Sequence, residues 1–422
     1  MKPELLMLVN EFPPTAESGV QRPLKFLKYL DRAGWKTFVV TPKKPTKTIL
    51  DHSLCGEIPP SARIHKTGSL GFGGRSVDRV AELRFAGVRG AFKPRALLSR
   101  FLQLINHVLF PLDKQIGWFP FAYLKACQII KIHKIRNVYI TAYPYSAFLA
   151  GILLKRRFKD RIFWVADYRD AWQFEPLMAE KLPAFRMRAI RKLDELVLKT
   201  CDMALFTTEA VRRTYIQHYP WLEAKSSTIT NGYDEDDFQA LEPRSFDKFT
   251  ILFMGKLYNP FRPNVMPVLE VIKKLDWQEF QYLHIGSISP EVEDLIRKRG
   301  YGFYDHRGYM DHRVALEYVL GADIVLLMIN DDKYSREFFP GKLFELLRAG
   351  RPLLTVGPQS CIVKDVIEES GAGEYVYAGD PNGILAALNR LRENPGKYVP
   401  RRDVVSRFDR ERLCRQLIGL YD

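Results

Sequence analysis

The strongest candidates for functional side chains in the sequence are two glutamates separated by a loop. They are Glu337 and Glu345, and the apolar spacing after the loop predicts a helix from about Lys342 and then a strand. Free backbone N–H groups at the start of that helix would bind an anion, and Gly341 would let a phosphate approach closely. Glu345 would accept hydrogen bonds from sugar or ribose hydroxyls. The alternative is an ordinary loop–helix–strand unit with a solvent-exposed glutamate.

Two further segments place polar groups where a parallel sheet would bind phosphate. Lys256 directly follows the apolar run 250–254, and Arg262 lies nearby. Cations just after a strand, at the carboxyl edge of a sheet, suit a diphosphate. Gly19 follows Phe12–Pro14 in the loop between the first expected strand and helix, where doubly wound folds bind phosphate. A structural turn is the alternative there.

The segment Asp167–Trp172 places charges directly behind a buried strand. Such charges are costly unless they are paired or functional. Arg169 and Asp170 are therefore expected either to form a structural ion pair or to contact a substrate.

Several other chemistries lack support in the sequence. Neither GxGxxG nor GxxxxGK[ST] occurs in the first loop, and no GxSxG is found, so nicotinamide-cofactor, P-loop and serine-hydrolase functions are unsupported. The histidines show no zinc spacing, and the five scattered cysteines form no CxxC pair. The acidic runs 331–332 and 234–237 are interpreted as solvated turns. We therefore expect no metal and no cofactor.

Composition and charge limit the class of protein. The 422 residues exceed what one core usually supports, and 46% hydrophobic with 27% charged residues is typical of globular proteins. Scattered cysteines suit a reducing compartment, and no secretory or membrane-spanning pattern is found, so we expect a cytoplasmic protein. The net charge of +15 favours anionic partners, but no nucleic-acid-binding module is recognised.

Residues 75–117 mix arginines and lysines with large apolar side chains. A basic amphipathic segment of this kind can lie on an anionic membrane, which would make the protein peripheral on the inner membrane face. The alternative is an insertion that packs on the first domain.

Apolar runs alternate with helical patterns along the chain, which implies parallel sheets covered by helices. Two consecutive series predict an α/β fold of two Rossmann-like, doubly wound domains, joined near the polar stretch 234–248. The expected strands are 4–9, 36–41, 137–141, 162–166, 203–207, 228–230, 250–254, 281–285, 324–328 and 352–356. The expected helices include 264–275, 291–298, 313–320 and 342–349.

Taken together, these segments resemble the GT-B glycosyltransferases, especially the large retaining group (family-four-like, group 1) with an E-x7-E motif. Glu337 and Glu345 have that spacing, and the order of the other matching stretches follows the family. These stretches are EFPP…G at 11–19, DYRDAW at 167–172, TNGYD at 230–234, FMGKL at 253–257, RGY…ADI at 307–324 and FPGKLFELLRAGRP at 339–352.

The resemblance implies two domains facing each other across a cleft. An acceptor-side domain would span 1–240, a nucleotide-sugar-binding domain 241–400, and a helix within 401–422, about 403–420, would return to the first domain. It implies donor contacts from Gly19, Lys256, Arg262, Gly308, Tyr309, Pro340, Gly341, Lys342 and Glu345, and chemistry from Arg169, Asp170 and Glu337. Arg169 and Asp170 stand where many family members carry a histidine.

The activity implied is transfer of a sugar from a nucleotide diphosphate sugar to a glycan or lipid-linked acceptor, with retention and without a metal. Polysaccharide assembly would be the setting. A sugar-nucleotide epimerase or hydrolase of the same fold is one alternative. A non-catalytic protein that binds anions or membrane is the other.

Overall fold

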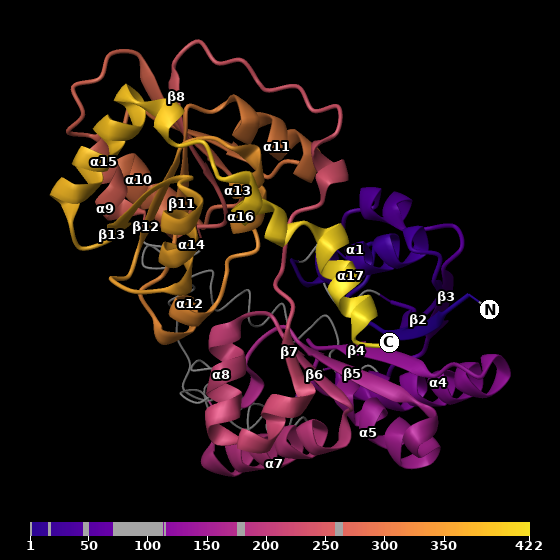
Figure 1. The fold of residues 1–422 in the computed structure, drawn as a ribbon. Coiled ribbons are helices and arrows are strands. Elements are labelled where there is room, and N and C mark those ends of the chain that lie inside the picture. The colour runs from indigo at the N-terminus through magenta and orange to yellow at the C-terminus, as the bar shows by residue number, and fades with distance from the viewer. Residues whose placement is uncertain are drawn as a thin grey trace, which may run out of the picture. The chain divides into compact units, whose positions relative to one another are not determined.

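The computed structural model describes residues 2–15, 18–44, 50–70, 113, 115–174, 182–257 and 265–422. Contacts within the chain divide it into two compact units (Figure 1). The first unit comprises Met1–Ile229 and Cys414–Asp422, and the second comprises Thr230–Leu413.

The first unit is built on a seven-stranded parallel sheet with the order β3-β2-β1-β4-β5-β6-β7. Its central strands are apolar and buried on both faces, as parallel strands between two helical layers must be. The strand order reverses between β1 and β4, which is where such sheets bind ligands. The strands are β1 (Glu4–Leu8), β2 (Lys36–Pro42), β3 (Arg63–Thr67), β4 (Asn137–Thr141), β5 (Phe163–Tyr168), β6 (Met203–Phe206) and β7 (Ser226–Thr228).

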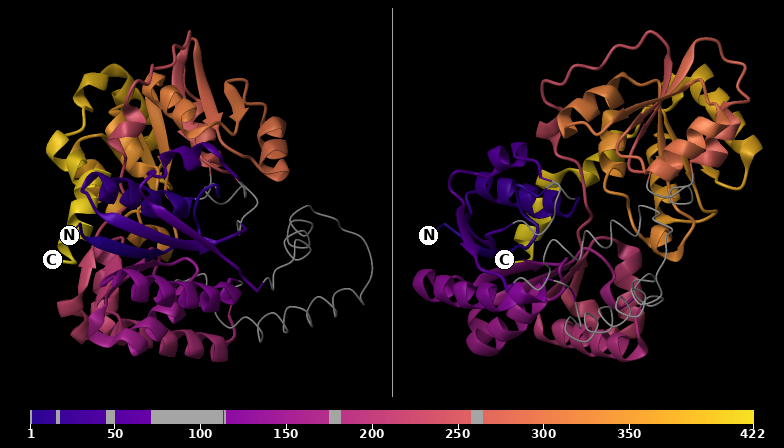
Figure 2. Two further views of the ribbon diagram at one scale, coloured as in Figure 1. Left: turned by 90° about the vertical axis from the view of Figure 1, so that its right-hand side faces the viewer. Right: turned by 180° about the vertical axis from the view of Figure 1, so that it is seen from behind.

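Helices cover both faces of this sheet. The helices α4, α5 and α7 pack side by side on one face, and α1 and α17 lie on the other (Figures 1 and 2). Gly151 of α5 lies against the Trp164 ring of β5, where an added Cβ would come within 2.2 Å of it. The helices are α1 (Ser18–Arg32), α4 (Phe119–His133), α5 (Ala147–Phe158), α7 (Ala184–Thr200), α8 (Glu209–His218) and α17 (Arg410–Gly419).

The second unit repeats the design with a six-stranded parallel sheet of order β10-β9-β8-β11-β12-β13. One core cluster joins its sheet to α9, α10 and α15, and the other to α11, α13, α14 and α16. The strands are β8 (Phe249–Met254), β9 (Phe280–Ile285), β10 (Tyr304–Gly308), β11 (Ile324–Met328), β12 (Leu353–Gly357) and β13 (Gly373–Tyr377). The helices are α9 (Met266–Ile272), α10 (Pro290–Arg299), α11 (His312–Gly321), α12 (Lys333–Glu337), α13 (Leu343–Ala349), α14 (Ile362–Ser370), α15 (Pro381–Glu393) and α16 (Arg402–Val405).

The predicted α/β fold with two doubly wound domains is confirmed, but three strands were missed. These are β3, β10 and β13, each at an edge of its sheet. The strand expected at 228–230 lies two residues earlier. No helix among the described residues is long and apolar enough to cross a bilayer.

The prediction of one continuous helix over 403–420 was wrong. The chain forms α16, a short 3-10 turn and then α17, with an extended residue at Asp409 between them. The Asp409 carboxylate accepts hydrogen bonds from the backbone N–H groups of Glu411 and Arg412, at 2.7 and 3.2 Å. Aspartate in this position caps a new helix, which explains the break.

Candidate functional site

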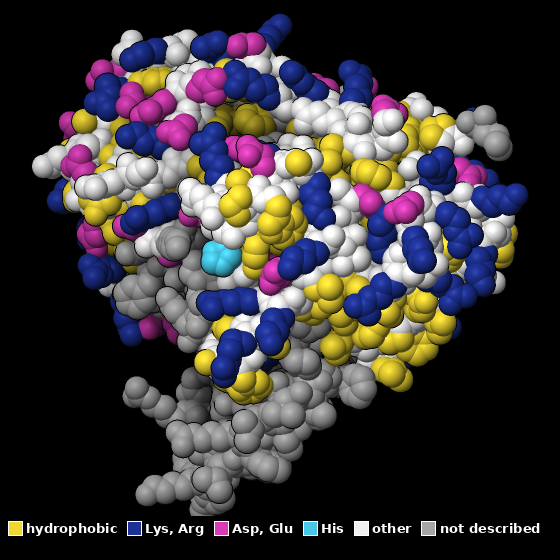
Figure 3. Space-filling model, turned by 60° about the horizontal axis from the view of Figure 1, so that its bottom comes forward, with side chains coloured by type: hydrophobic (Ala, Val, Ile, Leu, Met, Phe, Trp, Pro, Cys, Tyr) yellow, Lys and Arg dark blue, Asp and Glu magenta, His cyan; other side chains and the backbone are white. Residues whose placement is uncertain are grey.

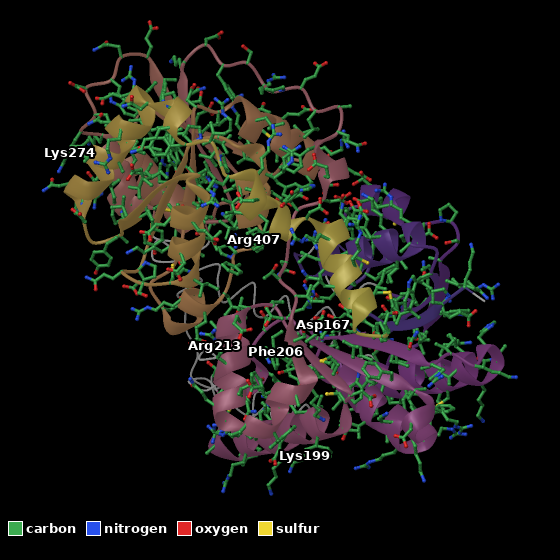
Figure 4. All side chains as sticks on the ribbon, in the orientation of Figure 1. Asp167, Lys199, Phe206, Arg213, Lys274 and Arg407 are labelled. Carbon is green, nitrogen blue, oxygen red and sulfur yellow. The ribbon has the colours of Figure 1, made fainter. Side chains whose placement is uncertain are left out.

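A buried ion pair lies under the carboxyl edge of the first sheet. Asp167, labelled in Figure 4, is the fifth residue of β5, and its carboxylate accepts hydrogen bonds from Arg22 of α1 at 2.9 to 3.2 Å. Tyr139 and Thr141 of β4 donate to the same carboxylate, at 2.5 and 3.0 Å. Arg22 is 2% exposed and Asp167 is wholly buried. Every oxygen of this buried charge therefore has donors, as burial requires.

The pKa values of this cluster follow from its burial. Burial alone would lower the pKa of Arg22, but the Asp167 carboxylate beside it raises that pKa above its ordinary value. Burial, then the same carboxylate, raises the pKa of Tyr139 well above its usual range. Arg22 therefore stays positively charged, and Tyr139 stays a hydrogen-bond donor.

A second ion pair lies directly after the strands. Arg169 donates to Glu11 at 3.0 Å, and the two side chains are 10% and 8% exposed. Arg169 also donates to the backbone carbonyls of Ala142 and Tyr143, and its own carbonyl accepts from Thr207 at 2.9 Å. Residues that follow β1 and β4 thus meet around the Arg169 guanidinium, and a residue that follows β6 holds the Arg169 backbone.

Gly19 belongs to the same group. A Cβ added there would lie 1.9 Å from a guanidinium nitrogen of Arg169 and 2.3 Å from a carboxylate oxygen of Glu11. A side chain at this position would therefore displace the ion pair as it stands. Asp170 follows Arg169 and is partly exposed.

In the second unit, two of the predicted cations, Lys342 and Lys256, lie at the end of β8. The Lys342 ammonium donates to the Met254 carbonyl at 2.6 Å and lies over the Phe253 ring, 4.6 Å from its centroid. A Cβ at Gly255 would come within 2.5 Å of that ammonium. Burial lowers the pKa of Lys342 to about 8. Lys256 is exposed just beyond Gly255.

The loop between the two predicted glutamates starts and ends differently from the prediction. Glu337 is the last residue of the short helix α12 instead of a loop residue, and α13 begins at Leu343, one residue after the expected start. Pro340 accepts a hydrogen bond from the Leu343 N–H at 3.0 Å. An added Cβ at Gly341 would meet no atom within 4 Å among the described residues.

Glu345 lies in the first turn of α13, and its carboxylate is 3.0 Å from Nε2 of His312 on α11. Gly308 ends β10 with φ of +72°, in the left-handed region that favours glycine, and its carbonyl accepts from the Gly286 N–H at 2.8 Å. Tyr309 follows and is 62% exposed. The ends of β9 and β10 are thereby linked.

Some predictions fall outside this geometry. Arg262 and most of 75–117 lie outside the described residues. The acidic runs form capped turns, since Asp332 accepts from the Ser335 N–H at 2.8 Å and Asp234 from the Asp236 N–H at 3.1 Å.

Sequence reasoning missed three residues of these groups. Glu11 and Arg22 were given no role, and His284, which contacts the Gly255 carbonyl, was considered only as a zinc ligand. A charge directly after a buried strand singled out Arg169, and the same signal applies to Glu11. Nothing in the local pattern marks Arg22, which lies on a helix 145 residues from its partner Asp167.

The comparisons concern the fold. No family model and no curated protein matches the sequence. Sucrose-phosphate synthase from Thermosynechococcus elongatus is similar in structure, with a TM-score of 0.65 and 14% identity over 100% of this chain and 98% of that one. Anabaena HepE in complex with UDP has a TM-score of 0.62 and 14% identity, over 100% of this chain and 99% of that one. A putative UDP-N-acetylglucosamine 2-epimerase from Listeria monocytogenes has a TM-score of 0.57 and 10% identity, over 100% of this chain and 96% of that one. The predicted resemblance to GT-B glycosyltransferases is confirmed in the fold.

The buried ion pair predicts that two cations of the first unit contribute very differently to its stability. Arg22→Met should destabilise the unit by about 3–5 kcal/mol, because it leaves the Asp167 carboxylate buried without its partner. Lys199→Met removes an exposed partner of Glu195, with side chains 57% and 39% exposed, and should cost about 0–1 kcal/mol. Urea unfolding followed by tryptophan fluorescence measures both, and equal losses would contradict the assigned role of Asp167.

Proposed function

We propose that this protein is a glycosyltransferase that moves a sugar from a nucleotide diphosphate sugar to a glycan or lipid-linked acceptor. The observation that carries the proposal is the group of Lys342, Gly255 and Lys256 at the carboxyl edge of the second sheet. It lies at the end of β8, beside the point where the strand order reverses, which is where doubly wound sheets bind ligands. The GT-B fold over the full chain length, and UDP bound to the similar HepE, support it.

The proposed donor contacts extend along this edge. Breaking the sugar–phosphate bond leaves negative charge on the departing diphosphate, and fixed cations and N–H groups would stabilise that charge. We assign this task to Lys256, Lys342 and the backbone of 340–341, and ribose binding to Glu345. Gly308 and Tyr309 would border the base. In the second unit, Arg262 is a further proposed donor contact, and Glu337 would act near the reacting carbon. In the first unit, Gly19 is proposed as a donor contact, and Arg169 and Asp170 are proposed to act in the chemistry.

We further propose that transfer proceeds with retention and without a metal, because cationic side chains would take the role of a divalent ion. Incubation with UDP-, GDP- and ADP-sugars, with and without glycan acceptors, tests the reaction class. Product with acceptor present supports transfer. Conversion of the donor without an acceptor indicates an epimerase or hydrolase. If no nucleotide diphosphate stabilises the protein against heat, the protein is neither kind of enzyme. NMR of the product anomer tests retention, and activity in EDTA tests metal independence.

Lys256→Ala should lower kcat by about a hundredfold or more, because it removes a cation from the leaving diphosphate. Lys274, labelled in Figure 4, is an exposed lysine of the same unit, and Lys274→Ala should leave turnover unchanged. Turnover of the Lys256 variant within a few-fold of wild type would sink the diphosphate role.

A pH profile tests Lys342 separately. Since the pKa of Lys342 is about 8, its ammonium is lost as the pH rises through that value. The kcat/KM for donor should therefore fall above about pH 8, as it reports groups of the free enzyme. Lys342→Arg keeps its charge at every relevant pH, so the alkaline fall should disappear. An identical fall in both proteins would assign it to another group.

A lipid-linked acceptor would require contact with a membrane, and the charge distribution favours this. Residues 119–161 and 184–200, which contain α4, α5 and α7, carry fourteen Lys and Arg against three Asp and Glu. Exposed apolar side chains lie on the same helices, among them Leu124, Ile132 and Phe185. Figure 3 shows dark blue and yellow side chains together on this lower face. Mixed basic and apolar surfaces bind anionic lipid.

Vesicle sedimentation measures this contact. The protein should pellet with phosphatidylserine-containing vesicles at low salt and be released at high salt. Reversing two exposed charges, Lys131→Glu and Arg156→Glu together, should weaken binding at least about tenfold. The matched pair Lys274→Glu and Arg407→Glu on the second unit should not. Equal binding to neutral vesicles would contradict the electrostatic basis.

A further inference from the structure

His284 of β9 is a buried imidazole to which the proposed reaction assigns no task. Its Nε2 lies 2.8 Å from the carbonyl oxygen of Gly255, and its Nδ1 lies 2.7 Å from the hydroxyl of Tyr304. A carbonyl oxygen can only accept a hydrogen bond, so Nε2 carries the proton. The Nδ1 atom then accepts from the Tyr304 hydroxyl. The tautomer of His284 is thereby fixed from both sides.

The imidazole is also kept neutral. Burial lowers the pKa of His284 to about 4, against the opposing effect of the Gly255 carbonyl, and the nearby His306 and Lys342 lower it further. Phe253 of β8 and Tyr304 of β10 are the other rings packed beside it. At neutral pH, His284 is therefore an uncharged donor whose direction is set.

What His284 holds is the first turn after β8. The Gly255 N–H donates to the Ile285 carbonyl at 2.8 Å, and the preceding carbonyl of Met254 accepts from Lys342 at 2.6 Å. With the bond from His284, three successive backbone groups of this turn are fixed. Lys256 follows immediately.

The arrangement recurs one strand further out. His306 of β10 has its Nε2 2.8 Å from the carbonyl oxygen of Gly286, the glycine that follows β9. The two imidazoles stack, with centroids 4.8 Å apart and 23° between planes. Each imidazole thus contacts the carbonyl of the glycine that ends the neighbouring strand. The repetition makes an accidental contact at Gly255 a poor explanation.

We propose that His284 is a positioning residue which, with Tyr304, holds the Gly255 peptide so that the turn at Gly255–Lys256 is already formed when the diphosphate of the donor arrives. The inference rests on the proposed function, because it takes this turn as the donor contact. A preformed turn contributes to affinity by removing the entropy cost of ordering it during binding.

Amide hydrogen exchange of the protein without ligand tests the first half of the proposal. In His284→Leu, the amides of Gly255 and Leu257 should exchange at least tenfold faster, while amides of the first unit keep their rates. His284→Gln, which retains a side-chain donor, should restore part of the protection. If His284→Leu does not fold, Tyr304→Phe removes only the hydroxyl that fixes the tautomer.

The chain offers a matched control in Tyr282. Its ring stacks on Tyr304 at 5.5 Å, and its buried hydroxyl has no hydrogen-bond partner among the described residues. Tyr282→Phe should therefore leave exchange at Gly255 unchanged. If neither His284→Leu nor Tyr304→Phe raises that exchange above the Tyr282→Phe level, the proposal is overturned.

Titration with UDP, GDP and ADP tests the second half. The nucleotide that binds wild type should bind His284→Leu and Tyr304→Phe about five- to tenfold more weakly. If the variants bind as tightly as wild type, the positioning role is wrong and the proposed function stands. If wild type binds none of the three, the donor site fails and the donor role of His284 fails with it, although the exchange result still reports whether His284 holds the turn.

Discussion

A polar group at the carboxyl edge of a sheet covered on both faces must find its partner inside the protein, and this requirement shapes both units. In the first unit, the requirement falls on Asp167, which is wholly buried in β5. Arg22 meets it from α1, and two hydroxyl groups complete the shell. The ion pair of Arg169 and Glu11 follows directly on the strands above it. The segment 167–172, which was predicted to take part in the reaction, is thus supported by a buried ion pair. Removing either partner of that pair would strongly destabilise the unit.

The second unit meets the same requirement with different chemistry. The carbonyls of Met254 and Gly255 are held by the Lys342 ammonium and by the neutral His284. Neither contact neutralises the positive charge of Lys342, and no carboxylate of the described residues pairs with it. The charges at the edge of the first sheet are therefore balanced by one another. The edge of the second sheet keeps the Lys342 cation, whose pKa is lowered by burial. A bound anion would relieve that cost, and this is the physical reason for proposing the second edge, and not the first, as the diphosphate site.

The sequence predicted the centre of each sheet better than its edges, for a physical reason. Central strands such as β1 and β8 are buried on both faces and form continuous apolar runs. The missed strands β3, β10 and β13 have one neighbour each and stay half exposed, so their residues are mixed. Loop-borne site residues were found through glycines and charges after strands. Contacts such as Arg22 to Asp167 or His284 to Gly255 depend on the assembled sheet and leave no local pattern.

Two glycines that looked alike in the sequence differ in what the structure requires of them. At Gly19, a Cβ would collide with Arg169 and Glu11, so any side chain there disturbs an ion pair of the protein itself. A substitution at Gly19 would displace that ion pair whether or not a phosphate approaches, so a loss of activity there would say nothing about the donor. At Gly341, a Cβ would meet open space within the described residues, and φ lies outside the left-handed region. An alanine there costs the free protein little, so a loss of donor affinity at Gly341 would have to come from the ligand. Of the two, Gly341 is the position where glycine can be tied to phosphate binding.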